Sequence, residues 1–220
     1  MKLGLISDIH ANLPALEAVL ADMPTVDELV CAGDVVGYNP WPGACVDIVR
    51  ERCSAVVQGN HDRTVSSPER YRHNEMAYAG LRHAREQLTP AQREWLDGLP
   101  RTQTLSGNVL LVHDHPTQQD RYVYPHSVPG LRTHIDSYRG CVLGHSHVQF
   151  AERVEGRLVL NPGSVGQPRD GDPEAAYAVL DTDTLDVDLR RVPYDVDRVV
   201  QAIADAGLPH DTGARLRRGE

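Results

Sequence analysis

Short apolar runs recur along the chain, and each is followed by small residues and then by Asp, Asn or His. The clearest run extends from Leu29 to Ala32 and stops at Gly33 and Asp34. Runs of this kind are typical of the inner strands of a parallel sheet, where ligands bind beyond the carboxyl ends of the strands. Four further runs end at Asp8-Ile9-His10, at Asn60-His61-Asp62, at His113 and at His145-Ser146-His147. We therefore expect five strands to deliver Asp, Asn and His side chains to one edge.

The segments between the first of these runs predict helices. Apolar residues at helical spacing, with Asn12 placed as the N-cap, indicate a helix over residues 13–21. A second helix is expected over residues 44–52, before the strand that reaches Gln58. Strand and helix thus alternate as β-α-β-α-β, which implies right-handed crossovers and helices packed on the sheet.

The rest of the chain changes from helices to strand pairs. Helices are expected over residues 74–88, 89–96 and 196–206, strand pairs over 103–105 with 109–112, 149–154 with 157–160 and 176–180 with 185–192, a loop over 63–73 and a loose polar tail over about 208–220. No shift in composition marks a linker, so residues 1–220 are expected to form a single domain. The predicted fold class is α/β, a two-sheet β-sandwich flanked by helices.

Charge and cysteine content narrow the class of protein. The formal net charge of −9 and the pI of about 5.6 argue against stable nucleic-acid binding. The 4 cysteines have no CxxC spacing, so we expect buried thiols in a reducing compartment. No apolar run reaches the length of a signal-peptide core or a membrane span. We therefore expect a cytoplasmic protein without membrane contact, and the sequence is compatible with a homo-oligomer.

The polar residues at the strand ends form a set of metal donors without a thiolate. The donors are Asp8, His10, Asp34, Asn60, His113, His145 and His147. This set suits Mn²⁺, Fe²⁺, Zn²⁺ or Co²⁺ better than a thiolate zinc site or an all-oxygen calcium site. Mn²⁺ is expected first, with Mg²⁺ as a further alternative. Because these donors exceed what one catalytic ion can use, we expect two divalent ions that share Asp34, an arrangement typical of phosphoryl transfer.

Together these motifs resemble the calcineurin-like metallophosphoesterase superfamily. The matching blocks, in order, are Asp8-x-His10, Gly33-Asp34-x-x-Gly37, Gly59-Asn60-His61-Asp62, His113 and Gly144-His145-Ser146-His147. They cover roughly residues 2–168, and residues 161–169 resemble the smaller bacterial and archaeal branch of the superfamily. Ala11 departs from the pattern, in which a glycine commonly follows the first His. The resemblance implies an α/β/β/α sandwich and metal-dependent hydrolysis of phosphoesters.

The resemblance also implies a ligand set for each ion. One ion would be held by Asp8, His10, Asp34 and His147, and the other by Asp34, Asn60, His113 and His145. The nucleophile would be a metal-bridging hydroxide that attacks phosphorus in line, without a phosphoenzyme intermediate.

Further residues beside these motifs are candidates for catalysis and substrate binding. His61 is not a ligand in the family and is expected to face the substrate, where it either protonates the leaving oxygen or stabilises charge on the phosphoryl group. Asp62, the second catalytic candidate, either orients that imidazole or caps a loop. Asn60, Asn12 and Arg169 are the expected substrate contacts, and a surface position is the alternative for Arg169.

Two other segments leave alternatives open. Asp114 and His115 stand where relatives usually carry small residues, so they either narrow the pocket, relay a proton or bind substrate, or form a solvated loop pair. Residues 120–124, with two tyrosines, form either a pocket wall or ordinary packing. For the histidines outside the motifs, such as His73 and His134, a surface or satisfied position is expected.

The predicted function is hydrolysis of a small phosphorylated substrate. The chain is short and lacks a large inserted cap, which favours an open site and a phosphodiester such as a cyclic nucleotide. A phosphomonoesterase or a serine/threonine protein phosphatase is the alternative, and a dinucleoside polyphosphate hydrolase ranks below it. A non-catalytic binding scaffold would be expected to lack a ligand or His61, and all of these residues are present.

Overall fold

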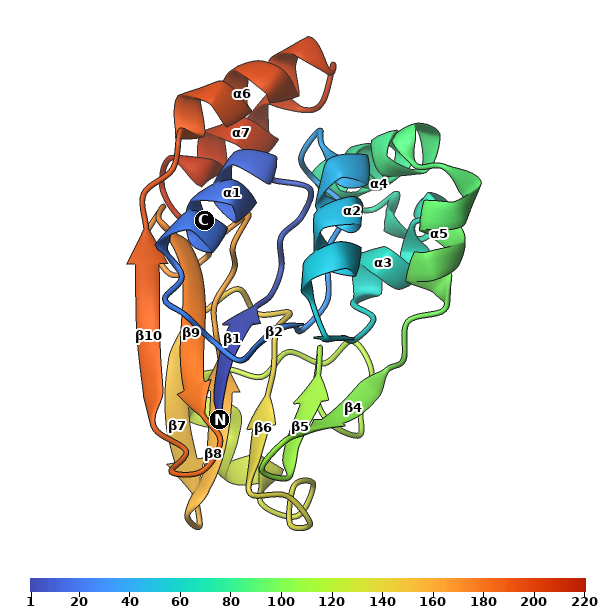
Figure 1. Cartoon of the computed structure of the whole chain (residues 1–220). Coiled ribbons are helices and arrows are strands. Elements are labelled where there is room, and N and C mark those ends of the chain that lie inside the picture. The colour runs from blue at the N-terminus through green and yellow to red at the C-terminus, as the bar shows by residue number, and fades with distance from the viewer.

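Two five-stranded sheets lie face to face in the computed structural model, which describes residues 1–220 (Figure 1). The first sheet has the order β10-β9-β1-β2-β3 and consists of β1 Lys2–Ile6, β2 Glu28–Cys31, β3 Ala55–Val56, β9 Ala175–Asp181 and β10 Val187–Val192. The second has the order β4-β5-β6-β8-β7 and consists of β4 Thr102–Leu105, β5 Val109–Val112, β6 Gly140–Val142, β7 Phe150–Val154 and β8 Arg157–Asn161. The predicted two-sheet α/β sandwich is confirmed.

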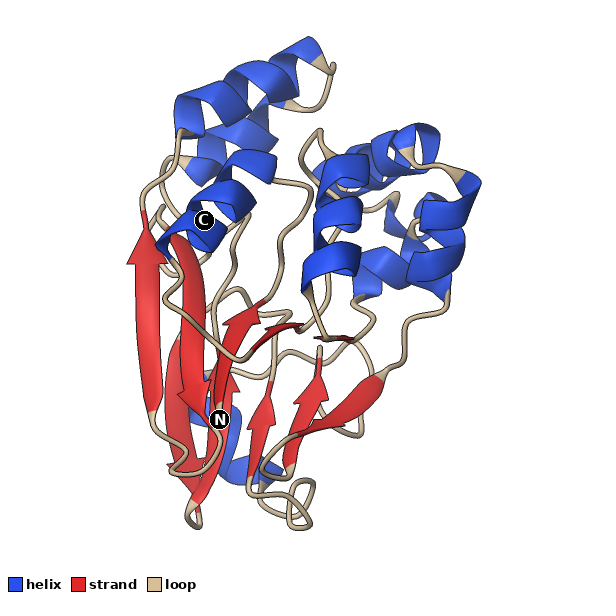
Figure 2. Ribbon diagram, viewed as in Figure 1, coloured by secondary structure: helices blue, strands red, loops and turns tan.

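The α-helices gather at one end of the molecule, as Figure 2 shows. They are α1 Leu13–Asp22, α2 Pro42–Arg52, α3 Asn60–Thr64, α4 Glu75–Gln87, α5 Pro90–Asp97, α6 Val196–Asp205 and α7 His210–Leu216. Of the two 3₁₀ helices, η1 Pro68–Tyr71 packs against α4, whereas η2 Pro125–Leu131 packs on the second sheet. Helix α1 begins where predicted, because the Asn12 side chain accepts a hydrogen bond from the Ala15 amide at 3.3 Å. Helix α5 begins at a capping box formed by Thr89 and Gln92. None of the helices has the length and apolar character needed to cross a membrane.

Successive side chains along a strand point to opposite faces of the sheet and so pack into separate core layers. In β5, Val109 and Leu111 pack between the two sheets, whereas Leu110 and Val112 face the other side. That other side is covered by η2 and its flanking turns, through Val128 and neighbouring apolar residues. Helices α1 and α2 cover the outer face of the first sheet in a third cluster of buried side chains.

Parallel pairing brings the polar strand ends to one place. β1 pairs in parallel with β2, and β2 with β3, so the residues after these three strands emerge at the same edge. β5 and β6 are likewise parallel in the second sheet. The two edges are tied together, since the His113 imidazole Nδ1 lies 2.7 Å from the Ala32 carbonyl oxygen. The fold therefore assembles one site from both sheets.

Two expected irregular segments are helical. Residues 63–73 contain the end of α3 and the 3₁₀ helix η1 rather than only a loop. The expected loose tail is wrong in its larger part, because it forms α7, in which Thr212 and Leu216 are buried. Leu216 packs with the apolar face of α6, through Val199 and Ile203, and this burial orders a segment whose composition is otherwise polar.

Candidate active site

The loops that follow the strands hold several candidate ligands in a strained backbone conformation. Positive φ angles occur at Asp8 (52°), His10 (48°), Asp34 (54°), His145 (66°) and His147 (58°). Non-glycine residues rarely adopt this left-handed conformation, and it persists only where the surroundings hold the backbone in place. Here hydrogen bonds between the loops do so, for example from the His10 amide to the Asp34 carbonyl at 3.0 Å.

The first group of donors consists of Asp8, His10 and His147, all buried. The Nε2 atoms of His10 and His147 lie 3.0 Å apart, and Nε2 of His147 lies 3.2 Å from Oδ1 of Asp8. Two donors that bind one ion at about 2.1 Å, at an angle near 90°, also lie about 3.0 Å apart. The spacing in this group is therefore the spacing that a single divalent ion requires.

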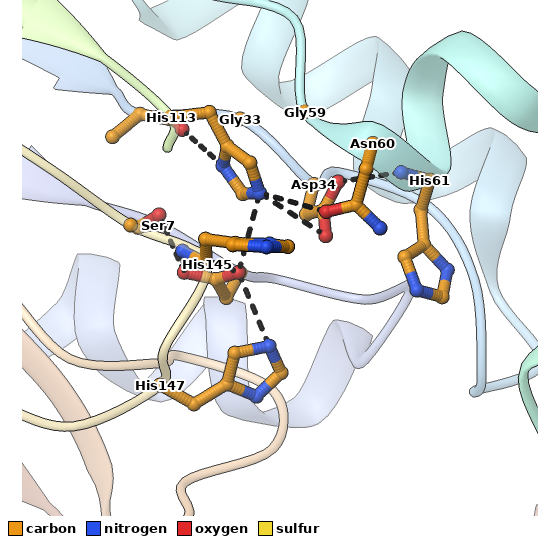
Figure 3. Close-up of polar contacts among 12 residues, drawn as sticks. Ser7, Gly33, Asp34, Gly59, Asn60, His61, His113, His145 and His147 are labelled. Atoms are coloured by element: carbon orange, nitrogen blue, oxygen red, sulfur yellow. Dashed lines mark hydrogen bonds and ion pairs between the residues drawn. The ribbon is translucent and has the colours of Figure 1, made fainter. Parts of the chain in front are cut away.

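The second group consists of Asp34, Asn60, His113 and His145. Nε2 of His113 lies 3.4 Å from Oδ2 of Asp34 and 3.2 Å from Oδ1 of Asn60 (Figure 3). The donor atoms of Asp34, His113 and His145 fall within 4.8 Å of one another. Oδ2 of Asp34 also lies 3.7 Å from Nε2 of His10, so this carboxylate faces both groups.

Backbone carbonyls set the orientation of three of these imidazoles. Nδ1 lies near the carbonyl oxygen of Val36 for His10 (3.1 Å), of Ala32 for His113 (2.7 Å) and of Gln167 for His147 (2.6 Å). A carbonyl oxygen only accepts hydrogen bonds, so Nδ1 carries the hydrogen and the lone pair of a neutral ring is on Nε2, facing the centre. These residues fit two divalent cations in donor type, number and orientation.

The charges in the centre are distributed unevenly. Burial by itself disfavours charge on Asp34, but the surrounding imidazoles, His113 foremost, hold the pKa of Asp34 well below its usual range. Burial would also lower the pKa of His113, yet the carboxylates of Asp34 and Asp8 raise it to about 10. Burial and the charge of His113 lower the pKa of His145 to about 4. Without metal, His113 is the protonated imidazole beside the buried carboxylates.

His61 lies beside the two groups with its ring among aromatic neighbours. Its ring centroid is 4.8 Å from those of His10 and Tyr38 and 5.2 Å from that of Tyr71. Nδ1 of His61 is buried without a hydrogen-bond partner, and burial, together with the charge of Arg169, lowers the pKa of His61 to about 4. At neutral pH this imidazole is therefore neutral, and its buried Nδ1 atom faces the backbone at Gly37.

Two predicted site residues have structural roles instead. The Asp62 carboxylate accepts hydrogen bonds from the amides of Asp34 (2.8 Å), Val35 (2.8 Å), Val36 (3.2 Å) and Gly59 (3.1 Å). The carboxylate therefore caps the loops at Asp34 and Gly59, as the loop-capping alternative predicts. It makes no hydrogen bond to the His61 ring. Asn12 is buried, caps α1 and donates to the Gly166 carbonyl at 2.9 Å, so the expected substrate contact at Asn12 is wrong.

Asp114 and His115 also support the fold around the site. Asp114 is buried, accepts from Arg101 at 3.1 Å and from the amide of Asp120 at 2.5 Å, and so holds the loop that carries Tyr122. His115 is buried against His134, with ring centroids 4.7 Å apart. The alternative of a solvated loop pair is wrong, because backbone and side-chain partners draw both residues inward.

A cavity of about 290 Å³ opens over the candidate metal centre. The predicted residues that line it are Asp34, Asn60, His61, His145, His147 and Arg169. Six further residues line the cavity, and the sequence pattern assigns them no role in the site or leaves their role open: Tyr38, Tyr71, His73, Asn74, Tyr122 and Arg215. Tyr122 stacks on His145 with centroids 4.1 Å apart, which supports the pocket-wall alternative for its loop.

Tyr71 shows why these residues were missed. Its hydroxyl accepts a hydrogen bond from Nδ2 of Asn60 at 2.5 Å, which turns Oδ1 of Asn60 toward His113. A single aromatic residue in a polar segment carries no sequence signal for such a contact. Only the packing of η1 against α4 brings the hydroxyl to the site.

Comparison with known proteins agrees with this geometry. Residues 1–185 match the model of the calcineurin-like phosphoesterase superfamily domain. The chain is 32% identical to an uncharacterized protein of Methanocaldococcus jannaschii over 99% of this chain and 98% of the relative, and 32% identical to the phosphodiesterase YfcE of Escherichia coli over 85% and 91%. The crystal structure of a metallophosphoesterase from Sphaerobacter thermophilus is similar at 33% identity and a TM-score of 0.88, covering 100% of this chain and 99% of that chain. Helices α6 and α7 lie beyond the residues that the family model matches.

Proposed function

This chain belongs to the calcineurin-like phosphoesterase superfamily, and we propose that within it the protein is a phosphodiesterase that uses two divalent ions, with Mn²⁺ preferred. The observation that carries the proposal is the position of Asp34. Its Oδ2 atom lies 3.4 Å from Nε2 of His113 and 3.7 Å from Nε2 of His10, one from each donor group. A carboxylate in this position can bridge two ions.

In the proposed site the two ions share Asp34, and each has further ligands of its own. Asp8, His10, Asp34 and His147 would hold one ion, and Asp34, Asn60, His113 and His145 the other. When bound, two divalent ions supply a hydroxide nucleophile near neutral pH and neutralise charge on the phosphoryl oxygens. Tyr71 turns the Asn60 amide so that its oxygen is available to the second group.

His61 and Arg169 are the proposed substrate contacts of the reaction. Because His61 is neutral, its ring N–H would donate a hydrogen bond to a phosphoryl oxygen, and charge stabilisation is favoured over protonation of the leaving group. Arg169 lines the same cavity and offers its guanidinium to a phosphate oxygen of the substrate.

A diester is favoured over a monoester for two reasons. YfcE, which covers most of this chain's length, is named a phosphodiesterase. In addition, His61 is neutral and is not an imidazolium that could balance a second negative charge. A phosphodiester carries one negative charge on the transferred group, whereas a monoester dianion carries two. We propose small phosphodiesters, cyclic nucleotides among them, as the substrate class.

The test compares bis-p-nitrophenyl phosphate with p-nitrophenyl phosphate. Protein stripped with EDTA is refilled with Mn²⁺, Fe²⁺, Zn²⁺, Co²⁺ or Mg²⁺, and release of p-nitrophenol is followed for each metal. We expect Mn²⁺-dependent turnover with a higher kcat/KM for the diester. A higher kcat/KM for the monoester would replace the proposal with a phosphomonoesterase, and turnover that persists in EDTA would contradict a metal-dependent reaction.

A further inference from the structure

Two arginines from distant parts of the chain line the cavity above the candidate metal centre. Arg169 lies in the loop after β8, and Arg215 lies in α7. No Asp or Glu side chain forms a salt bridge with either guanidinium within 4.0 Å, although 31 of the residues are Asp or Glu. Arg169 instead donates to Oε1 of Gln167 at 2.7 Å and to the hydroxyl of Tyr38 at 3.3 Å.

The position of Arg215 is fixed at both ends of its segment. Leu216 is buried against α6, and Gly213 packs close to Val200. After the helix, the carbonyl of Gly219 accepts a hydrogen bond from the Gly171 amide at 3.0 Å. Gly219 has a φ of +64°, and a Cβ atom there would lie 2.6 Å from the backbone of Asp172. The end of the chain is thereby joined to the loop that carries Arg169.

The two guanidiniums carry charge of the same sign in a partly buried place. Burial and the charge of Arg169 lower the pKa of Arg215, which expresses the cost of placing the two cations near each other. Arg215 donates one hydrogen bond, from Nε to the main-chain carboxyl oxygen of Glu220 at 2.5 Å, and its remaining N–H donors have no partner. A pair of arginines with unused donors beside a phosphoryl site is suited to an anion supplied by the ligand.

We propose that Arg169 and Arg215 form a second anion subsite, and that the preferred substrates are phosphoesters that carry another phosphate group near the one that is cleaved. Helix α7 then belongs to the active site, and Arg215 determines specificity. This inference rests on the proposed function, since it names the substrate class of the same cavity. The cleaved phosphate lies at the metal centre beside His61, and the second phosphate lies between the two guanidiniums.

The test uses two thymidine esters that differ by one phosphate. Thymidine 5′-(p-nitrophenyl phosphate) and its 3′-phosphorylated form both release p-nitrophenol when water breaks the same P–O bond. For the Mn²⁺-loaded full chain, we expect a kcat/KM that is about 10- to 100-fold higher for the 3′-phosphorylated ester, mainly through a lower KM, because charge-assisted hydrogen bonds have about this strength. Arg215→Ala should remove most of this preference, and Arg215→Lys should retain part of it.

The control variant is Arg217→Ala, two residues after Arg215 at the end of α7. Arg217 is exposed and paired with Asp197, outside the cavity, so both esters should be hydrolysed at wild-type rates. Thermal unfolding shows whether each variant is folded. If Arg215→Ala does not fold, the ratio of kcat/KM values for the two esters, measured on Arg215→Lys, tests the subsite. A wild-type enzyme that does not distinguish the esters, or an Arg215 variant with the wild-type ratio, would overturn the subsite.

A binding measurement separates this inference from the proposed function. Isothermal titration compares thymidine 3′,5′-bisphosphate with thymidine 5′-phosphate on the same Mn²⁺-loaded protein. If neither ester is hydrolysed, the proposed phosphodiesterase activity fails, while tighter binding of the bisphosphate that is lost in Arg215→Ala would still support the subsite. Equal affinities for the two nucleotides, in wild type and variant alike, would contradict it.

Discussion

His10 and His147 face each other across the candidate metal centre with their Nε2 atoms 3.0 Å apart. Each ring has its Nδ1 atom at a backbone carbonyl, so in the neutral form two lone pairs point at one another. Burial lowers the pKa of both imidazoles, which keeps them neutral. Two facing lone pairs repel unless a cation lies between them.

Metal should therefore stabilise the fold as well as support turnover. At a Mn²⁺ concentration about 100 times Kd, binding to the folded state adds about 2.7 kcal/mol, or a rise in Tm of about 5–10 °C for a chain of this size. Differential scanning fluorimetry with EDTA and with Mn²⁺ measures the shift. A His147→Ala variant should show a smaller shift, and an unchanged Tm in wild type would contradict a metal site at this position.

Replacement of Asp34 should remove both ions' common ligand. In wild type, Oδ1 of Asp34 accepts a hydrogen bond from the His61 amide at 2.8 Å. Asp34→Asn keeps this acceptor oxygen and the size of the side chain but removes the negative charge. We expect turnover to fall by about 10³-fold or more and bound Mn²⁺, measured by mass spectrometry after gel filtration, to fall below two per chain. Asp205→Asn, an exposed change on α6, is the control. Full metal content and activity in Asp34→Asn would contradict the bridging assignment.

Metal uptake should release a proton from His113. Since its pKa is raised to about 10 in the metal-free protein, His113 is protonated at neutral pH and must lose that proton to bind metal. Titration of Mn²⁺ in buffers of different ionisation enthalpy counts the protons released. We expect wild type to release about one proton per chain more than His113→Asn. A heat of binding that does not depend on the buffer would show that His113 is neutral.

The same shift predicts how the stability of the metal-free protein depends on pH. The pKa of His113 is higher in the folded state than the usual value of 6.5, so its contribution is fully present below about pH 6.5 and is lost as the pH rises toward about 10. In EDTA, the free energy of unfolding of wild type should therefore decrease over this range relative to His113→Asn. Parallel curves for the two proteins would contradict this.

Gly37 should be required for the position of His61. A Cβ atom on Gly37 would collide with Nδ1 of His61, and its φ of +101° is costly for any other residue. Gly156→Ala is the matched control, because Gly156 has a φ of +80° and nothing within 4 Å of a new Cβ. Both variants should lose about 1–2 kcal/mol of stability by urea unfolding, whereas only Gly37→Ala should lose turnover. Equal activity of the two variants would argue against a role for the His61 ring.

Esters with different leaving groups distinguish the two possible roles of His61. His61→Ala should retain metal and lose about 10²–10³-fold in kcat if the ring stabilises phosphoryl charge. That loss should be the same for p-nitrophenyl and for phenyl esters. A larger loss with the poorer leaving group would instead identify His61 as the general acid, the alternative that its lowered pKa argues against.

Local sequence determines much of this protein. An apolar run followed by small residues and a polar donor predicts a strand and the loop after it, and parallel strands end at one edge by geometry alone. For this reason the sheet strands, the cap at Asn12 and the cluster of Asp, Asn and His donors were predictable. Each of these features depends on residues that are neighbours in the chain.

The tertiary structure decided the features that depend on distant segments. The Asp62 carboxylate could be assigned to the amides of Asp34 and Val35 only once the loops were placed, because its own neighbours leave its partner open. Tyr71 and Arg215 come to the cavity through the packing of η1 and α7, and burial of Leu216 orders a polar segment that has no strong periodicity. Burial and long-range charge, which set the neutral state of His61 and the proton on His113, exist only after the chain has folded.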